Sequence, residues 1–398
     1  MESDFLSAEE AAAALGVSVH TLYVYVGRKG IRSQPIPGSR SRRYWKSDVD
    51  RVRRGEEPAP PAIGKLRFES QITLITDQDF YYRGRSALQL AAAASFESVA
   101  ALLWGAAEDL CFGPTEPVTP DLMAPMRGLL GYQGEMTRAA VLIPLLEEAN
   151  AKAYDLTPVG MARTGGDILR WLAAIITDSG SPATLPLPQF IARRLQRSEV
   201  DADLIRRALV LSADHGFEPG TVAVRTVAST GVTPWRAVIT GLSATGGRRP
   251  RIGVYDAISR FVSEIIASPD PDDPVLRRIR DGETLPGFDS PVYQHGDPRA
   301  RTLLAFCAEA FADDRAFRKL ASALALIREV RGLEPNFALA HVFVGSRIGL
   351  THRPSLFHLG RAAGWIAHAI EQYAVGENVH VEGLYSGPLP QEIAPGTS

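Results

Sequence analysis

The sequence lacks the features that mark several large classes of protein. It has only two cysteines, Cys111 and Cys307, and their spacing matches no metal-binding motif. We therefore expect a reduced, cytoplasmic setting without a disulfide framework. The segment MESDFLSAEE is acidic and has no apolar core, so we expect no secretory signal peptide. Charged or turn residues interrupt every apolar run well short of a membrane span, which argues against a membrane protein.

Motifs for common cofactors are missing as well. The sequence contains no phosphate-binding P-loop, no GxGxxG fingerprint, no HExxH pair and no Cys/His cluster with zinc-like spacing. It also shows no internal repeat. We therefore expect no tightly bound cofactor and no metal ion.

The formal net charge of −2 hides a strongly basic segment. Residues 28–54 contain ten Lys or Arg against two Asp, a local charge of +8, so the rest of the chain is acidic. A basic head on an acidic body indicates a polyanionic partner for the head alone.

Residues 6–26 predict two short helices joined by a turn. Ser7 and Glu10 form a capping box before AAAALG, Gly16 ends that helix, and Ser18 caps the next one, VHTLYVYV. The following PIPGSRSRRYWKSDVDRV predicts a basic β-wing and a short helix. Together these residues resemble the winged helix-turn-helix of MerR and excisionase proteins, in which R-R-Y-x-x-x-D-V follows the wing.

That resemblance implies binding to double-stranded DNA through residues 1–54. The second helix would enter the major groove, with bases or phosphates near His20, Thr21, Tyr23 and Arg28. Backbone phosphates would be neutralised by Arg40, Arg42, Arg43 and Lys46. Tyr44 and Trp45 are expected to pack the wing. The alternative is a solvated basic surface on a small protein-binding domain. One such head makes few contacts, so specific binding requires a dimer.

The rest of the chain resembles the citrate synthases over about residues 66–390. The stretch LSADHGFEPGTVAVRTVASTG at 211–231 is similar to the family's HADH(E/G)-x-x-x-S-T-x-x-x-R-x-x-x-S-T/S-G. Three further family-like blocks occur in the family's order. They are FESQITLITDQDFYYRGRSALQLAAAASFESVAALLWG, LPGFDSPVYQHGDPRARTLL and GRAAGWIAHAIEQ.

The resemblance implies a mainly all-α citrate synthase fold and a homodimer that would pair two DNA-binding heads. After a Pro-rich linker at 55–65, a large helical domain would comprise 66–220 and 330–398, and a smaller one 221–329. Tyr82, Arg83 and Gly84 would build a turn.

The family reaction condenses acetyl-CoA with oxaloacetate and water to give citrate and CoA, and three of its substrate contacts recur here. His215 corresponds to the histidine that hydrogen-bonds oxaloacetate, and Arg299 and Arg361 to arginines that bind its carboxylates. His295 is a nearby candidate for the same site. His368 is expected to be structural.

The family's catalytic groups, in contrast, are replaced. The histidine that stabilises the acetyl-CoA enolate becomes Pro250 or Arg251, depending on the register, within a basic run that either meets CoA phosphates or is solvated. The histidine that activates the oxaloacetate carbonyl becomes Ser290, and the aspartate base becomes Asn336. Further family positions also differ, at Ser212, Asp289, Pro291, His380 and Glu382.

These replacements leave three functional interpretations. The first is a regulator that binds a di- or tricarboxylate or acyl-CoA and biases DNA binding, and this is the one we favour. The second is a citrate-synthase-type acyltransferase with a rearranged site. The third is a non-catalytic subunit that pairs with an active citrate synthase.

Overall fold

A computed structural model describes residues 5–36, 39, 41–55, 68–131, 133–247, 254–288, 290, 292–293, 295–350 and 354–380. The chain folds as two units, one comprising Met1–Glu69 with His380–Ser398 and the other Ser70–Val379. Within the described segments, no helix combines the length and apolar character needed to cross a membrane.

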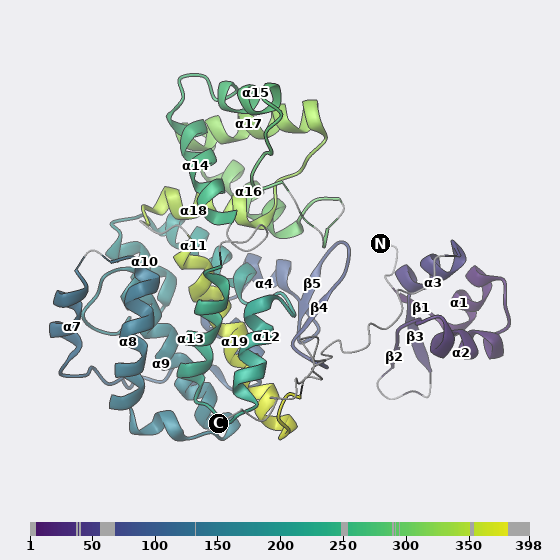
Figure 1. The fold of residues 1–398 in the computed structure, drawn as a ribbon, viewed down its shortest axis with the longest axis horizontal. Helices are drawn as coiled ribbons and strands as arrows, with labels where there is room; N and C mark the ends of the chain where they lie inside the picture. The colour runs from purple at the N-terminus through teal and green to yellow at the C-terminus, as the bar shows by residue number, and fades with distance from the viewer. Residues whose placement is uncertain are drawn as a thin grey trace, which may run out of the picture. The chain divides into compact units, whose positions relative to one another are not determined.

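The first unit pairs a small sheet with three helices (Figure 1). Its elements in order are β1 (Phe5–Leu6), α1 (Ala8–Leu15), α2 (Val19–Arg28), β2 (Ser33–Pro35), β3 (Arg42–Trp45) and α3 (Lys46–Arg53). The antiparallel sheet has the order β1-β3-β2. The capping box of Ser7 and Glu10 forms, Gly16 ends α1 in the left-handed region, and Ser18 caps α2.

A separate apolar core holds this unit together, with Ala11, Leu22, Ile31, Tyr44 and Val49 all buried. Tyr44 therefore packs inside the unit. Half-buried Trp45 stacks edge-on against Phe5 at 4.8 Å.

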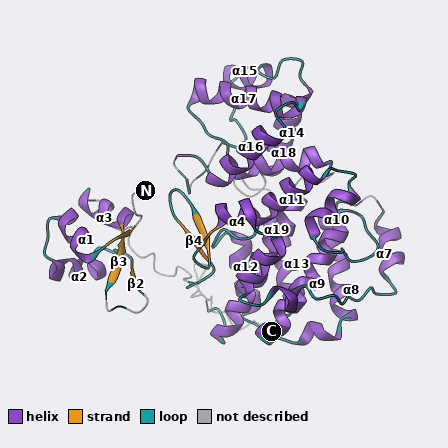
Figure 2. Cartoon of the chain, turned by 180° about the vertical axis from the view of Figure 1, so that it is seen from behind, coloured by secondary structure: helices purple, strands orange, loops and turns teal. Residues whose placement is uncertain are grey.

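The second unit is mainly helical, as predicted (Figure 2). It opens with β4 (Thr73–Ile75), β5 (Phe80–Tyr82), β6 (Arg85–Ser86), α4 (Ala87–Ala93), α5 (Phe96–Trp104), α6 (Glu108–Cys111), α7 (Met123–Leu130), α8 (Glu135–Ala149) and the 3₁₀ helix η1 (Ala151–Tyr154). It continues with α9 (Pro158–Ile176), α10 (Leu187–Arg194), α11 (Glu199–Ser212), α12 (Pro219–Ala228) and α13 (Pro234–Thr245). The last elements are α14 (Val254–Ala267), α15 (Asp273–Arg280), α16 (Pro298–Ala310), α17 (Arg315–Arg331), α18 (Phe337–Ile348) and α19 (Ser355–Val375).

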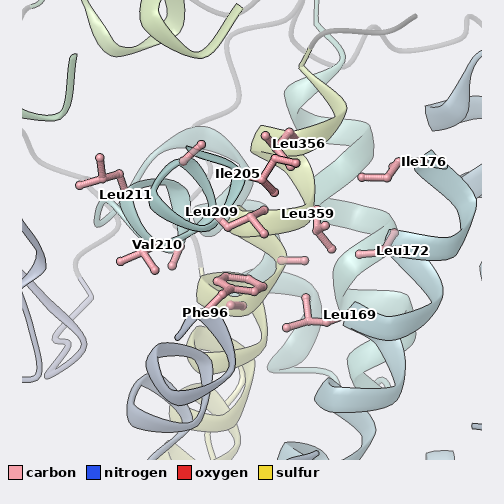
Figure 3. Close-up of a cluster of buried hydrophobic side chains, with 14 of the residues drawn as sticks. Phe96, Leu169, Leu172, Ile176, Ile205, Leu209, Val210, Leu211, Leu356 and Leu359 are labelled. Carbon is pink, nitrogen blue, oxygen red and sulfur yellow. The ribbon is translucent and has the colours of Figure 1, made fainter. Parts of the chain in front are cut away.

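Helix α19 is the centre of this unit. It packs against α5, α9, α11, α12 and α13, and its buried residues include both polar and apolar side chains. Figure 3 shows Leu356 and Leu359 of α19 among apolar side chains from α5, α9 and α11. A helix buried on nearly every side has a fixed position, so the side chains that it carries are held in place.

A second group of helices packs mainly within itself. Helix α14 contacts α15, α17 and α18, and α16 contacts α18, and this group lies at the top of Figure 1. Helices α12 and α13 fall within the residues expected for a smaller domain, and they pack against α19.

Two glycines let the segment after α11 lie directly against α19. A Cβ atom at Gly360 would come within 2.7 Å of the Ser212 Cβ, and one at Gly364 within 2.3 Å of the Ala213 carbonyl oxygen. Only a residue without a side chain permits this approach. The end of α11 is therefore fixed directly beside Arg361.

Candidate functional site

His215 lies just beyond the end of α11, in a segment anchored by Asp214. The buried Asp214 carboxylate accepts hydrogen bonds from Thr73 Oγ1 at 2.5 Å and from the Gly216 N–H at 2.9 Å. The Tyr82 hydroxyl donates to the Asp214 carbonyl at 3.1 Å. The β4–β5 hairpin thus holds Asp214, and the Asp214 carboxylate in turn holds the backbone beyond His215. Tyr82, expected to build a turn, instead supports this segment.

The His215 ring is held by two aromatic residues. Its Nε2 lies 2.8 Å from the Tyr293 hydroxyl, and the Phe80 ring is 5.6 Å away, centroid to centroid. Burial lowers the pKa of His215 well below its usual value, and the positive charges of Arg299 and Arg361 lower it further. His215 is therefore a neutral imidazole at neutral pH.

Arg299 sits in the first turn of α16 and pairs with the residue that caps the helix. Its Nε and Nη2 donate to the two carboxylate oxygens of Asp297 at 3.0 and 2.7 Å. Burial alone would lower the pKa of Arg299, but Asp297 raises it above the ordinary value. The guanidinium lies over the Phe337 ring at 4.6 Å. Its charge is thus already balanced within the chain.

Arg361 is buried in the middle of α19 and, in the described part of the chain, has no acidic hydrogen-bond partner. Its Nε donates to the Ser212 carbonyl oxygen at 2.8 Å, and the guanidinium lies 5.0 Å from the Phe357 ring centroid. Its Nη1 is buried without a hydrogen-bond partner. A buried charged donor normally has a partner, so this atom is the strongest sign of a ligand position.

Aromatic contacts connect these groups into one cluster, and the longest separation between contacting ring centroids is 6.5 Å, between Phe337 and Phe357. Phe337 and Phe357 contact each other and both contact His341. Tyr255 lies 5.7 Å from Phe357. Tyr255 and Phe357 are half-buried, so the cluster reaches the solvent on that side. We call these residues, with His215, Tyr293, Arg299 and Arg361, the arginine cluster.

Comparison with known proteins now identifies the family. Residues 162–380 match the family model for the C-terminal domain of citrate synthase. The chain belongs to the citrate synthase family.

Relatives of this chain carry related names. Citrate synthase from Haloferax volcanii is 30% identical over 204 residues, which cover 50% of this chain and 54% of the relative. The 2-methylcitrate synthase of Mycobacterium tuberculosis is 25% identical over 342 residues, covering 79% of this chain and 86% of the relative. In matches of 30% identity or more, this chain spans about half the length of the curated relative.

A solved structure of the family shares the fold. The citrate synthase of Thermoplasma acidophilum, in a ternary complex with carboxymethyl coenzyme A and oxaloacetate, superposes with a TM-score of 0.67. The match is 18% identical and covers 85% of this chain and 98% of that chain. The expected citrate synthase fold is thereby confirmed.

In this member of the citrate synthase family, Ser290 and Asn336 occupy positions at which catalytic groups are expected. Both residues make structural hydrogen bonds here. The Ser290 hydroxyl oxygen accepts from the Tyr293 N–H at 3.3 Å. Asn336 caps α18 by accepting from the Leu339 N–H at 3.1 Å, and its own N–H donates to the Gly287 carbonyl at 2.7 Å. Pro250, Arg251 and Glu382 lie outside the described residues.

The other histidines singled out in the sequence lie in different surroundings. His295 and His380 are exposed. His368 is buried, with its Nε2 3.3 Å from an Asp214 carboxylate oxygen and its Nδ1 3.4 Å from Arg225 Nη1. His368 therefore supports the residue that anchors His215, which agrees with its expected structural role.

Within the described segments, no group of three or more His, Cys, Asp or Glu side chains is placed to hold a metal ion. Sequence reasoning brought His215, Arg299 and Arg361 forward, and the structure places all three in the arginine cluster. It missed Tyr255, Tyr293 and His341. Tyr293 carried a signal, because it lies in the family-like block LPGFDSPVYQHGDPRARTLL. His341 carried none.

Proposed function

We propose that this member of the citrate synthase family binds a small carboxylate at the arginine cluster and binds DNA through its N-terminal unit. Ligand occupancy would bias DNA binding. The observation that carries the proposal is Arg361 Nη1, a buried cationic donor without a hydrogen-bond partner among the residues that the structure describes. A ligand carboxylate supplies the acceptor that this atom lacks. Neutral His215 and the remaining nitrogen of Arg299 offer further contacts.

The residues at the family's catalytic positions favour ligand binding without turnover. The family reaction needs a base for the methyl proton of acetyl-CoA, and the amide of Asn336 cannot act as one. A serine hydroxyl at 290 replaces the imidazole that polarises the oxaloacetate carbonyl. Losing one such group costs about 10²–10⁴-fold in rate, and groups that act together are not separately dispensable.

The carboxylate and CoA classes are the ligands to test first. The Thermoplasma acidophilum relative was crystallised with oxaloacetate and a CoA derivative. Oxaloacetate or a citrate-like acid fits the arginine cluster by charge. A CoA phosphate fits the basic run at 248–251 by charge, and that run lies outside the described residues.

The DNA-binding part of the proposal rests on the arrangement of the first unit. Helices α1 and α2 are joined by a short turn and followed by the β2–β3 hairpin, as in a winged helix-turn-helix. The exposed side chains include His20, Tyr23, Arg28, Arg42 and Arg43. Thr21 and Lys46 are half-buried, and Arg40 lies outside the described residues. A homodimer would present two such units to a palindromic site.

Ligand binding and turnover are separated by two parallel measurements. Release of CoA thiol from acetyl-CoA and oxaloacetate reports the family reaction, and the shift in melting temperature with carboxylates reports binding. We expect no thiol release above background and a carboxylate-induced shift. The shift should disappear in Arg361→Met, which keeps the apolar stem of the side chain and removes the guanidinium.

The control is His295→Ala, because His295 is exposed and should leave the shift unchanged. Thiol release at a rate typical of the family would reject the regulator and support the acyltransferase. The absence of any carboxylate-induced shift would also reject the proposal and favour a subunit that partners an active citrate synthase. DNA binding is tested separately. The affinity of the protein for duplex DNA should fall steeply as the salt concentration rises, and it should also be lower in the double variant Arg42→Ala/Arg43→Ala.

A further inference from the structure

Ser212 holds two side chains of the arginine cluster at once. Its carbonyl oxygen accepts from Arg361 Nε at 2.8 Å, and its hydroxyl lies 3.1 Å from His341 Nε2. Both partners also contact Phe357, at 5.0 and 5.8 Å. Arg361 and His341 are therefore neighbours, both held by Ser212 and both in contact with Phe357.

The hydrogen bonds of Ser212 determine which nitrogen of His341 carries the proton. The Ser212 hydroxyl donates to the Ala208 carbonyl oxygen at 2.6 Å, which uses its only hydrogen. It must then accept from His341, so the proton of the imidazole is on Nε2. The other nitrogen, Nδ1, carries a lone pair and is an acceptor.

His341 Nδ1 has no hydrogen-bond partner, although the side chain is fully buried. Burial lowers the pKa of His341 to about 3, and the charges of His358, Arg299 and Arg361 act in the same direction. The imidazole is therefore neutral at neutral pH and keeps its lone pair. Two unpaired atoms thus belong to neighbouring side chains, a cationic donor on Arg361 and a neutral acceptor on His341.

We propose that His341 makes the site selective for a 2-hydroxy acid over the corresponding 2-oxo acid. The inference rests on the proposed carboxylate binding and adds which chemical group the ligand carries at C2, next to its carboxylate. A carboxylate bound to Arg361 would place the substituent on its C2 atom beside Nδ1 of His341. A hydroxyl at C2 donates its hydrogen to Nδ1. A keto oxygen is only an acceptor, so it leaves Nδ1 unpaired and faces it with a second lone pair.

The test uses three acids that differ only at C2. L-malate carries a hydroxyl, freshly dissolved oxaloacetate a keto group, and succinate no substituent. Titration calorimetry on the full-length protein should give a dissociation constant about tenfold lower for L-malate than for oxaloacetate, the scale of one hydrogen bond to a buried acceptor. The ¹⁵N resonance of His341 Nδ1 should shift with L-malate and stay in place with succinate.

Two variants at the same position assign the selectivity. His341→Phe keeps an aromatic ring against Phe337 and Phe357 but removes the acceptor, so L-malate and oxaloacetate should bind equally. His341→Asn offers an amide oxygen at the position of Nδ1 and should restore part of the preference. His295→Ala is the matched control on an exposed histidine and should keep the full preference.

The outcomes separate the two proposals. Equal binding of L-malate and oxaloacetate to the unmodified protein overturns the role of His341 and leaves carboxylate binding intact. A preference that survives His341→Phe also overturns it. If none of the three acids binds, both proposals fail. Because the comparison of acids needs no variant, it decides the question even if His341→Phe does not fold.

Discussion

Arg299 and Arg361 carry the same charge but differ in what their surroundings leave available. Arg299 shares a bidentate ion pair with Asp297, two residues away and also buried, so its desolvation is compensated locally. Arg361 has a neutral carbonyl oxygen as its acceptor, and one of its nitrogens stays unpaired. At the residue scale, the unpaired donor that calls for a ligand acceptor therefore belongs to Arg361.

His341 also predicts how stability depends on pH. Its pKa falls from 6.5 to about 3 in the folded protein, so between these values the unfolded chain binds more protons. Stability is therefore retained above pH 6.5 and lost as the pH falls below it. At pH 5 the loss from this group is about 2 kcal/mol, because each pH unit below 6.5 contributes about 1.4 kcal/mol.

Urea denaturation at pH 7.5 and pH 5 checks this expectation. The drop in the free energy of unfolding between the two pH values should be about 2 kcal/mol smaller in His341→Phe than in the unmodified protein. His215 is present in both proteins and cancels from the comparison. An identical drop in both would show that His341 is not held neutral by burial.

At the scale of elements, the arginine cluster depends on how closely α19 approaches the end of α11. Gly364 is one helical turn beyond Gly360, and both lack the Cβ that would collide with residues 209–214. The same helix carries Arg361 between them. A change that pushes α19 away therefore moves Arg361 relative to Ser212 and His215.

Gly364→Ala should lower the free energy of unfolding by about 1–3 kcal/mol, the usual cost of forcing a methyl group into a packed interior. It should also weaken carboxylate binding, because the added Cβ would lie 2.3 Å from the Ala213 carbonyl oxygen. Gly128→Ala in α7 is the matched control, since no atom lies within 4 Å of its added Cβ. That variant should be neutral or gain about 0.5–1 kcal/mol. Similar effects of both changes would contradict the proposed contact.

At the scale of the whole molecule, the proposal joins a DNA-binding unit to a carboxylate-binding unit, and thermodynamics restricts how they communicate. If L-malate changes the affinity for DNA by some factor, DNA must change the affinity for L-malate by the same factor. A coupling of about 5- to 150-fold is typical of allosteric proteins.

This reciprocity is measured by titrating the protein with a duplex selected from a random-sequence pool, with and without saturating L-malate, and then with the roles exchanged. We expect equal factors in both directions. Arg361→Met should keep DNA binding and lose the effect of L-malate. If neither ligand changes the dissociation constant of the other although both bind, regulation is refuted. The two binding activities would then still stand.

The sequence predicted much of the fold because that information is local and periodic. The capping box of α1, its terminal Gly16 and the Ser18 cap of α2 form as predicted, since each depends on residues within one or two turns. The ordered family-like blocks likewise predicted the helical fold and brought His215, Arg299 and Arg361 forward together. Local signals of this kind survive in a single sequence.

The state of each side chain in the cluster was decided by the tertiary structure. The same residue types could be paired or unpaired, and only the packing shows that Asp297 neutralises Arg299 while Arg361 keeps a free donor. His341 gave no signal in the sequence, because its partner Ser212 is 129 residues away. Burial and long-range contacts set its protonation, and neither is encoded in any short stretch of the chain.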